Sequence, residues 1–249
     1  MHDGGMQILL TNDDGIDSPG LHALANKMCE FGDVTVFAPS GEYSGASVAI
    51  GHLAEGIADV YRCERPEMPG AQAVYHLDGP PALTVLLAGK GMFGSPPDLV
   101  VSGVNPGANV GLGVHYSGTV GACIAAAGLG IPGIAVSLQG VKRDGFAHWE
   151  TATDACARHV LRAASERRLV NINVPNRPLR EVEGERSAPL SRRLPWSLHN
   201  PSMEPTSEPD RFSVSFERYG PFEHVRGADV VLLDEGYVTI TDLTPTHPA

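Results

Sequence analysis

The chain has 249 residues, of which 42% are hydrophobic, so it is long enough to bury one full α/β core. Asp and Glu outnumber Lys and Arg by 29 to 18, and the formal charge of -11 argues against a nucleic-acid polymer or an anionic membrane as the main partner. The apolar runs are too short to cross a bilayer, residues 1–5 do not resemble a signal peptide, and the 4 cysteines form no CxxC pair. We therefore expect a cytoplasmic protein with reduced thiols.

Strand and helix signals alternate along residues 1–175. This alternation predicts right-handed βαβ units and a parallel sheet that is covered by helices on both faces. The predicted strands, in chain order, are Gln7–Thr11, Val34–Ala38, Ala73–Leu77, Asp98–Val104, Gly133–Leu138 and Leu169–Val174. The predicted helices are Leu21–Phe31, a helix that opens at Pro80–Pro81 and runs through Leu87, Thr119–Leu129, and His148–Arg168.

The composition changes after residue 175. Residues 176–210 are rich in Pro, Ser, Arg and Glu and show no helical period, whereas Arg211–Glu217 alternates like a strand. We interpret 1–175 as a Rossmann-like α/β body, 176–236 as a protruding β-hairpin arm, and 237–249 as a strand, Tyr237–Leu243, that returns to the body and ends in a tail. Such an arm often reaches a neighbouring subunit, and a surface insertion without a partner is the alternative.

The first strand runs directly into two adjacent carboxylates, in the stretch ILLTNDDGIDSPG. Asp13 and Asp14 repel each other there, and ionised groups are costly to desolvate at the end of a buried strand. Ligands of an open parallel sheet bind beyond the carboxyl ends of its strands, where EYSGAS (Glu42–Ser47) and SGVNPGANVG (Ser102–Gly111) also fall. Together these stretches offer hard oxygen ligands suited to Mg²⁺, Mn²⁺ or Ca²⁺. A turn in which one carboxylate caps the next helix is the other interpretation.

The stretch YSGTVGACIAAA, Tyr116–Ala127, points to the same edge of the sheet. Ser117, Gly118 and Thr119 precede a helix of small residues, so backbone N–H groups and the positive end of the helix dipole face the cleft and suit a phosphate. Ser117 or Thr119 is also expected to cap this helix. His115 lies beside the cleft and is a candidate proton donor. A helix start that faces a carboxylate pair predicts a phosphoester held between a metal ion and the helix dipole.

In this order, these stretches resemble the stationary-phase survival protein E (SurE) family of metal-dependent nucleotide phosphatases. The combination of NDDG with SGxNxGxNxG and YSGT is specific, and matching motifs extend over nearly the whole chain. They are ILLTNDDGIDSPG, VTVFAP with SGAS, DLVVSGVNPGANVG, YSGTVGA, GIPGIAVS, LVNINVP and DEGYVTIT. The resemblance implies a Rossmann-like three-layer α/β body with a parallel sheet, a C-terminal hairpin arm swapped between subunits, and a homodimer or homotetramer.

The resemblance also implies an acid-phosphatase-like 5'/3'-nucleotidase, which hydrolyses nucleoside 5'- or 3'-monophosphates to nucleoside and phosphate through a metal-activated water. One divalent metal ion per subunit is implied, Mg²⁺ or Mn²⁺, with Ca²⁺ as a substitute in a crystal. By motif position, the catalytic residues are Asp13 and Asp14, the metal ligands are Asp13, Asp14, Ser44 and Asn105, and the phosphate-binding residues are Asn12, Asn109, Ser117, Gly118 and Thr119.

The chain departs from the family pattern around the nucleotide pocket. Where members usually carry Gly-Thr-Pro, one residue and Asp-Cys, this chain reads GPPALT, so Pro80 and Leu83 replace the Thr and the acidic residue. Ala125 replaces a Glu, Ala49 replaces a polar residue, and the chain ends soon after DLTPTH, before the further helix of many members. We therefore expect a specialised paralogue acting on an unusual nucleotide. The alternatives are a phosphatase of a sugar phosphate, polyphosphate or other metabolite, and a non-catalytic phosphate-binding protein.

Overall fold

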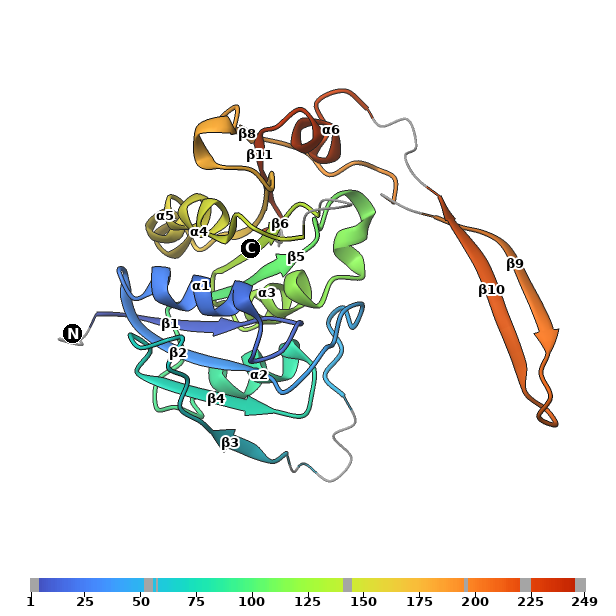
Figure 1. Cartoon of the computed structure of the whole chain (residues 1–249). Coiled ribbons are helices and arrows are strands. Elements are labelled where there is room, and N and C mark those ends of the chain that lie inside the picture. Colours follow the sequence, from blue (N-terminus) through green and yellow to red (C-terminus); the bar gives the residue numbers. More distant parts are fainter. Residues whose placement is uncertain are drawn as a thin grey trace.

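The computed structural model describes residues 5–51, 56, 58–140, 145–194, 197–219 and 225–244. These residues form a three-layer α/β body and a separate two-stranded hairpin (Figure 1). The strands are β1 Met6–Thr11, β2 Gly32–Pro39, β3 Val60–Arg62, β4 Ala73–Leu77, β5 Leu99–Pro106, β6 Gly133–Leu138, β7 Leu169–Val174, β8 Glu185–Ser187, β9 Ser197–Pro205, β10 Phe212–Tyr219 and β11 Val238–Asp242. The helices are α1 Pro19–Met28, α2 Pro81–Gly89, α3 Gly118–Gly128, α4 Trp149–Ala157, α5 Val160–Glu166 and α6 Asp229–Asp234, with 3₁₀ turns η1 Gly111–His115 and η2 Leu179–Glu181.

In the described residues the main sheet has 9 strands, in the order β3-β4-β2-β1-β5-β6-β7-β11-β8. The strands from β4 to β7 are parallel to one another, whereas β3 and β11 run antiparallel to β4 and β7. From β1 the chain proceeds to one edge of the sheet, and from β5 it proceeds to the other. The topological switch point therefore lies between β1 and β5, where ligands of open α/β sheets bind.

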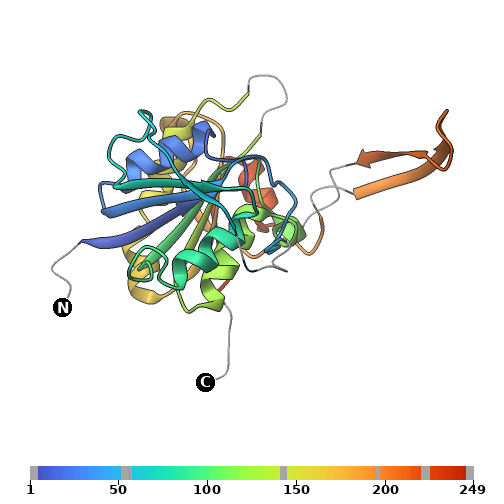
Figure 2. The ribbon, with the colours of Figure 1, turned by 90° about the horizontal axis from the view of Figure 1, so that it is seen from below.

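Two apolar layers hold the helices against the sheet. Helices α1, α4 and α5 pack on one face, and α2 and α3 pack on the other, as the turned view also shows (Figure 2). Strands β6 and β7 are buried at every residue, which explains why their sequences are mostly apolar, with Ser137, Asn171 and Asn173 as buried polar exceptions. The predicted α/β architecture with a parallel-dominated sheet is confirmed. No helix in the described ranges combines the length and hydrophobicity that a membrane-spanning helix needs.

The predicted single helix His148–Arg168 is wrong, because the chain forms two helices, α4 and α5, with a turn at Arg158 and His159. The cause is a contact with a distant segment. Arg158 Nη1 lies 2.5 Å from Glu185 Oε1, and His159 Nε2 lies 3.1 Å from Glu185 Oε2. A bond from His159 N–H to the Cys156 carbonyl tightens the last turn of α4, and the helix is interrupted where both side chains contact Glu185 of β8.

The β9–β10 hairpin projects away from the body (Figure 1), and its strands pair only with each other among the described residues. The predicted C-terminal hairpin is thereby confirmed. Within the range 176–236 assigned to the arm, β8 joins the main sheet beside β11, and α6 packs against β11. The hairpin itself spans residues 197–219. The division of the chain at residue 176 stays a prediction.

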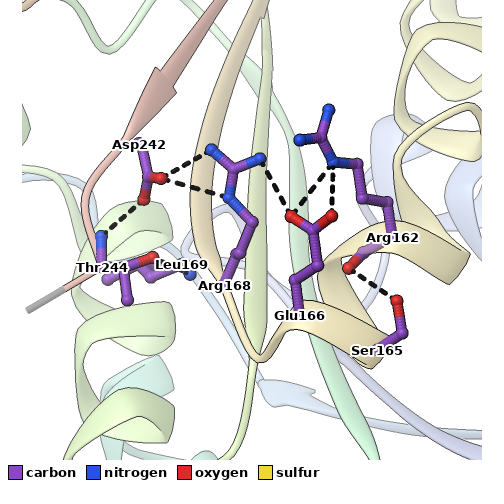
Figure 3. Close-up of polar contacts among 7 residues, drawn as sticks. All are labelled: Arg162, Ser165, Glu166, Arg168, Leu169, Asp242 and Thr244. Atoms are coloured by element: carbon purple, nitrogen blue, oxygen red, sulfur yellow. Dashed lines mark hydrogen bonds and ion pairs between the residues drawn. The ribbon is translucent and has the colours of Figure 1, made fainter.

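An ion-pair network joins the end of β11 to the residues that precede β7 (Figure 3). Arg168 Nη2 lies 2.5 Å from Asp242 Oδ2, and the same guanidinium contacts Glu166, which also pairs with Arg162. Thr244 N–H donates to Asp242 Oδ1 over 2.9 Å. Partial burial alone would raise the pKa of Asp242, but the hydrogen bonds from Thr244 and the Arg168 charge outweigh it and lower this pKa.

Replacing Asp242 by asparagine is expected to lower the free energy of unfolding by about 1 kcal/mol or less near neutral pH, because Arg168 and Thr244 lose a charged acceptor at a partly exposed site. A carboxyl with a lowered folded-state pKa stabilises the fold above its unfolded-state pKa, and this contribution disappears as the pH falls through the folded-state pKa. Urea unfolding at neutral and acidic pH measures both effects. A difference between Asp242→Asn and wild type that persists unchanged in acid contradicts this assignment.

Candidate functional site

The NDDG turn follows β1 at the switch point and is held by a hydrogen bond from the Asn12 side chain and by a backbone hydrogen bond to the end of β2. Asn12 Nδ2 donates to the Gly15 carbonyl over 2.9 Å, and the Ile16 N–H donates to the Pro39 carbonyl at the end of β2. Gly15 has a φ of +97°, and a side chain there would also come within 3.1 Å of the Gly41 backbone. The turn is therefore packed tightly between β1 and the segment that follows β2.

Asp13 lies directly against the start of α3. Its carboxylate Oδ1 accepts a hydrogen bond from Thr119 Oγ1 over 2.5 Å, and the side chain is almost completely buried. A Cβ on Gly118 would lie 2.8 Å from Asp13 Oδ2, so only a glycine allows this approach. Ser117 caps α3 by accepting a hydrogen bond from the Val120 N–H over 3.1 Å. The structure thus brings the NDDG turn and the YSGT turn into contact.

The EYSGAS segment, Glu42–Ser47, lies beside both the NDDG turn and α3. The Tyr43 N–H donates to the Asp13 carbonyl over 2.7 Å, and the Ser44 N–H donates to Glu42 Oε1 over 3.0 Å. Ser47 Oγ donates to the His115 carbonyl, and its backbone lies against Gly121 of α3. Ser44 is exposed at the edge of the site. This segment therefore spans from the carboxylate pair to the first turns of α3.

Asn105 is the penultimate residue of β5, and Asn109 follows the end of this strand. The register between β5 and β6 shifts between Ser102 and Asn105, an irregularity close to the end of β5. Asn105 Nδ2 donates to the Gly107 carbonyl over 2.6 Å. Asn109 is held more firmly, because Asn171 and Asn173 donate to its carbonyl and its own N–H donates to Asn173 Oδ1.

The two asparagines of β7 and the carboxylate of Glu42 were not identified from the sequence. Asn171 and Asn173 alternate on one face of a strand whose other residues are apolar, and buried amides in such a strand are a signal of a polar contact. They position Asn109, whose side-chain Nδ2 donates to Ser137 Oγ over 3.0 Å. Glu42 lies in the EYSGAS stretch, but nothing in that stretch marks its carboxylate as the acceptor of the Ser44 N–H.

Three carboxyl groups gather at the site without a counter-charge. Burial, followed by the neighbouring carboxylates of Asp13 and Glu42, raises the pKa of Asp14 to about 8. Burial also raises the pKa of Asp13, although the hydrogen bond from Thr119 favours its ionised form. Within the described residues, none of the three carboxylates forms an ion pair with Lys, Arg or His. A cation at this position would stabilise the ionised pair.

The donor atoms fit a hard divalent cation. Asp14 Oδ2 and Asn12 Oδ1 are buried, and neither accepts a hydrogen bond from the described part of the chain. No three His, Cys, Asp or Glu side chains among the described residues converge as a metal site. The two carboxylates would therefore need neutral oxygen ligands as well, and such all-oxygen sets suit Mg²⁺ or Mn²⁺.

The residues that depart from the family pattern lie mostly behind this site. Leu83 on α2 and Ala125 on α3 are both buried in the apolar cluster that also contains Leu9 and Phe37. Pro80 is the N-cap residue of α2, and a Cβ added at Gly51 would lie 3.5 Å from its Cδ. Leu83 and Ala125 thus add to the packing of α2 and α3 on the sheet, while the NDDG and YSGT turns keep their contact.

Comparisons with known proteins cover most of the chain. The family model described as Survival protein SurE matches residues 8–196. The 5'/3'-nucleotidase SurE of Escherichia coli O1:K1 / APEC is 36% identical over 243 residues, covering 96% of this chain and 90% of that protein. The 5'/3'-nucleotidase SurE of Klebsiella pneumoniae (strain 342) is 36% identical over 247 residues, with the same two shares.

A solved structure shares the fold as well. The crystal structure of the SurE protein from Aquifex aeolicus superposes with a TM-score of 0.76 and 28% sequence identity, over 97% of this chain and 94% of that one. The matched region includes the strands and turns that form the site at the switch point. From its family model, its relatives and its fold, the chain belongs to the SurE family.

Proposed function

We propose that the chain is a divalent-metal-dependent phosphomonoesterase, which hydrolyses nucleoside 5'- or 3'-monophosphates to nucleoside and phosphate. The observation that carries the proposal is the contact between Asp13 and the first turn of α3, at Gly118 and Thr119. It joins a carboxylate pair suited to a cation and a helix start suited to a phosphate. The names of the E. coli and K. pneumoniae relatives support the nucleotide as substrate.

Asp13, Asp14, Ser44 and Asn105 would hold the metal ion. When bound, a Mg²⁺ or Mn²⁺ ion supplies Lewis-acid chemistry, which polarises a phosphoryl oxygen and lowers the pKa of a coordinated water. The chain itself supplies position and a second electrostatic element. Asp14 Oδ2 has no hydrogen-bond donor among the described residues, so it is available to accept one from the attacking water and to orient it.

The start of α3 binds the phosphate in this mechanism. The first intrahelical bond runs from the Gly121 N–H to the Ser117 carbonyl, so the N–H groups of Gly118 and Thr119 precede it. These donors and the helix dipole stabilise negative charge on the equatorial oxygens of the transition state. The fixed backbone of Asn109 places its side chain at the same edge. His115 is exposed at the end of η1 and stays a candidate proton donor.

A substrate panel tests the proposed function. Phosphate release is measured from 5'- and 3'-nucleotides, sugar phosphates, a short polyphosphate and an aryl phosphate, with Mg²⁺, Mn²⁺ or EDTA. We expect metal-dependent release that is fastest from a nucleotide. Faster release from a sugar phosphate or polyphosphate would retain the phosphatase and replace its substrate class. Binding of inorganic phosphate without release from any ester would establish a non-catalytic binding protein.

We also propose that the hairpin packs against a second copy of the chain. A two-stranded hairpin by itself has no core in which to bury apolar side chains. Met203, Phe212 and Val214 are accordingly each more than half exposed. Val214 pairs directly with Met203, and Phe212 lies two residues away on the same face of β10. The opposite face carries Ser202 and Ser215, whose hydroxyls are hydrogen-bonded. An apolar face on a projecting ribbon is suited to burial in a subunit interface.

The triple variant Met203→Ser, Phe212→Ser, Val214→Ser is expected to elute as a monomer, whereas wild type elutes as a dimer or tetramer. The reason is that the substitutions remove apolar area from one face of the hairpin without touching the body. Size-exclusion chromatography with light scattering measures the mass. The control is Ser215→Ala, on the polar face, which should leave the mass unchanged. An unchanged mass for the triple variant would exclude this face as the interface.

A further inference from the structure

Asp229 is a buried carboxylate that the proposed chemistry does not use. It is the first residue of α6 and is fully buried. Its Oδ2 accepts a hydrogen bond from the Gly111 N–H over 2.7 Å, and its Oδ1 accepts from the Ser191 N–H over 2.8 Å and the Val230 N–H over 2.9 Å. Asp229 forms no ion pair within the described ranges, so these three N–H groups compensate for its burial.

The Asp229 carboxylate connects the site to the segment that leads into β9. Gly111 begins η1, the turn that leads from Asn109 to the α3 cap at Ser117. Ser191 lies on the segment that enters β9 and is itself almost completely buried. One side chain thus fixes the position of η1 relative to the start of the arm.

A second set of contacts joins the same two segments. The Leu112 N–H donates to the Arg193 carbonyl over 3.1 Å. Gly111 has a φ of +55°, and a Cβ there would lie only 2.4 Å from the Arg193 carbonyl oxygen. The backbone at Arg193 is therefore packed against the first turn of η1 at van der Waals distance. A shift of either segment has to be shared by the other, because neither has room to move independently.

We propose that Asp229 is a positioning residue for the phosphate cradle, the set formed by Asn109 and the Ser117–Thr119 turn. Asp229 holds η1, which connects these residues, and couples it to the segment with Ser191 and Arg193 that leads into β9. Its effect on turnover rests on the proposed function, whereas its effect on phosphate binding does not. Loss of the carboxylate charge weakens three charge-assisted hydrogen bonds at once. The η1 turn, which connects Asn109 with the Ser117 cap, then loses its hold on α6, whereas the carboxylate pair on the NDDG turn keeps its own contacts.

The test compares Asp229→Asn with Asp234→Asn. Asp234 is on the same helix, and its exposed carboxylate accepts a hydrogen bond from Gln139. For each variant we would measure the affinity for inorganic phosphate in the presence of Mg²⁺, the affinity for Mn²⁺ alone, kcat/KM, and the melting temperature. For Asp229→Asn we expect phosphate affinity and kcat/KM to fall at least about tenfold, with Mn²⁺ affinity within about threefold of wild type. Asp234→Asn should match wild type in all measurements.

Phosphate affinity within twofold of wild type in folded Asp229→Asn would overturn the inference. A parallel loss of Mn²⁺ affinity, phosphate affinity and melting temperature would also overturn it, because that pattern reports general loosening. If Asp229→Asn does not fold, Gly111→Ala tests the same contact from the other side, since its Cβ would displace the Arg193 carbonyl. If wild type hydrolyses no ester but Asp229→Asn still weakens phosphate binding, the proposed function fails and the positioning role stands.

Discussion

Asp13→Asn is expected to reduce metal-dependent phosphate release by at least about a thousandfold, which corresponds to roughly 4 kcal/mol of transition-state stabilisation. The substitution keeps the shape of the side chain and removes its charge. Asp13 is the carboxylate that lies against the start of α3, so this charge holds the cation beside the helix that binds the phosphate. Steady-state rates with saturating Mn²⁺ measure the loss, and isothermal titration measures the accompanying loss of Mn²⁺ affinity.

The fold is expected to survive this substitution. Thr119 Oγ1 still finds an oxygen acceptor on the asparagine, and the variant removes a buried charge that lacks a counter-charge. Circular dichroism and the melting temperature verify the folded state. The matched control is Asp17→Asn, which removes a carboxylate four residues along the same loop, where it is exposed and paired with Arg65. Full activity in folded Asp13→Asn would remove Asp13 from the mechanism.

Gly118→Ala is expected to lower kcat/KM about tenfold to a hundredfold, although alanine is the better helix former. The added Cβ would meet Asp13 Cβ and Oδ2 at 2.8 Å, closer than real Cβ contacts, so the carboxylate has to move away from the helix. A displacement of this kind costs transition-state alignment and leaves helix formation unaffected. Initial rates across substrate concentrations, combined with Mn²⁺ titration, separate the loss of metal from the loss of alignment.

The chain offers a matched control for this change at the other end of the same helix. A Cβ on Gly128, the last residue of α3, would meet no heavy atom within 4 Å. Gly128→Ala should therefore retain wild-type kcat/KM. If Gly118→Ala is as active as Gly128→Ala, the close approach of Asp13 to α3 has no catalytic importance, and the phosphate cradle has to be placed elsewhere.

The order of strands and helices in the body was largely predictable, because parallel strands buried on both faces produce long apolar runs. The predicted strands Gly133–Leu138 and Leu169–Val174 coincide with β6 and β7. Their alternation with helical segments was sufficient to predict the edge at which NDDG and YSGT meet. The structure places Asp13 beside Thr119 at that edge, while the roles of these residues stay a proposal.

Two features that the sequence did not predict, the turn between α4 and α5 and the hydrogen bonds of Asp229, depend on contacts between segments that are distant along the chain. The turn between α4 and α5 follows from Glu185, which has no local pattern that marks it as a partner of Arg158 and His159. The hydrogen bonds of Asp229 to Gly111 and Ser191 are equally non-local. Hydrophobic periodicity reports which face of an element is buried, but it does not report which polar partner the element meets.

Leu83 and Ala125 illustrate another limit of the sequence. Their difference from the family pattern was visible in the sequence, but their location in the fold was not. From the motif alone, both belong to the nucleotide pocket. In the structure, both side chains pack in the apolar layer between the sheet and helices α2 and α3. We therefore expect Leu83 and Ala125 to influence substrate preference through the placement of these helices, and the substrate panel reports whether that placement still favours a nucleotide.

The most direct test of a metal-dependent site between NDDG and α3 is a Mn²⁺ titration of metal-free protein. The occupancy of Mn²⁺ and the rate of phosphate release from a nucleoside 5'-monophosphate are followed on the same sample, for wild type and Asp13→Asn. The site described above predicts no release without metal, a rate that rises in step with occupancy to one ion per subunit, and no rise in the variant. Release that is undiminished in the metal-free protein, or equal in Asp13→Asn, would contradict it.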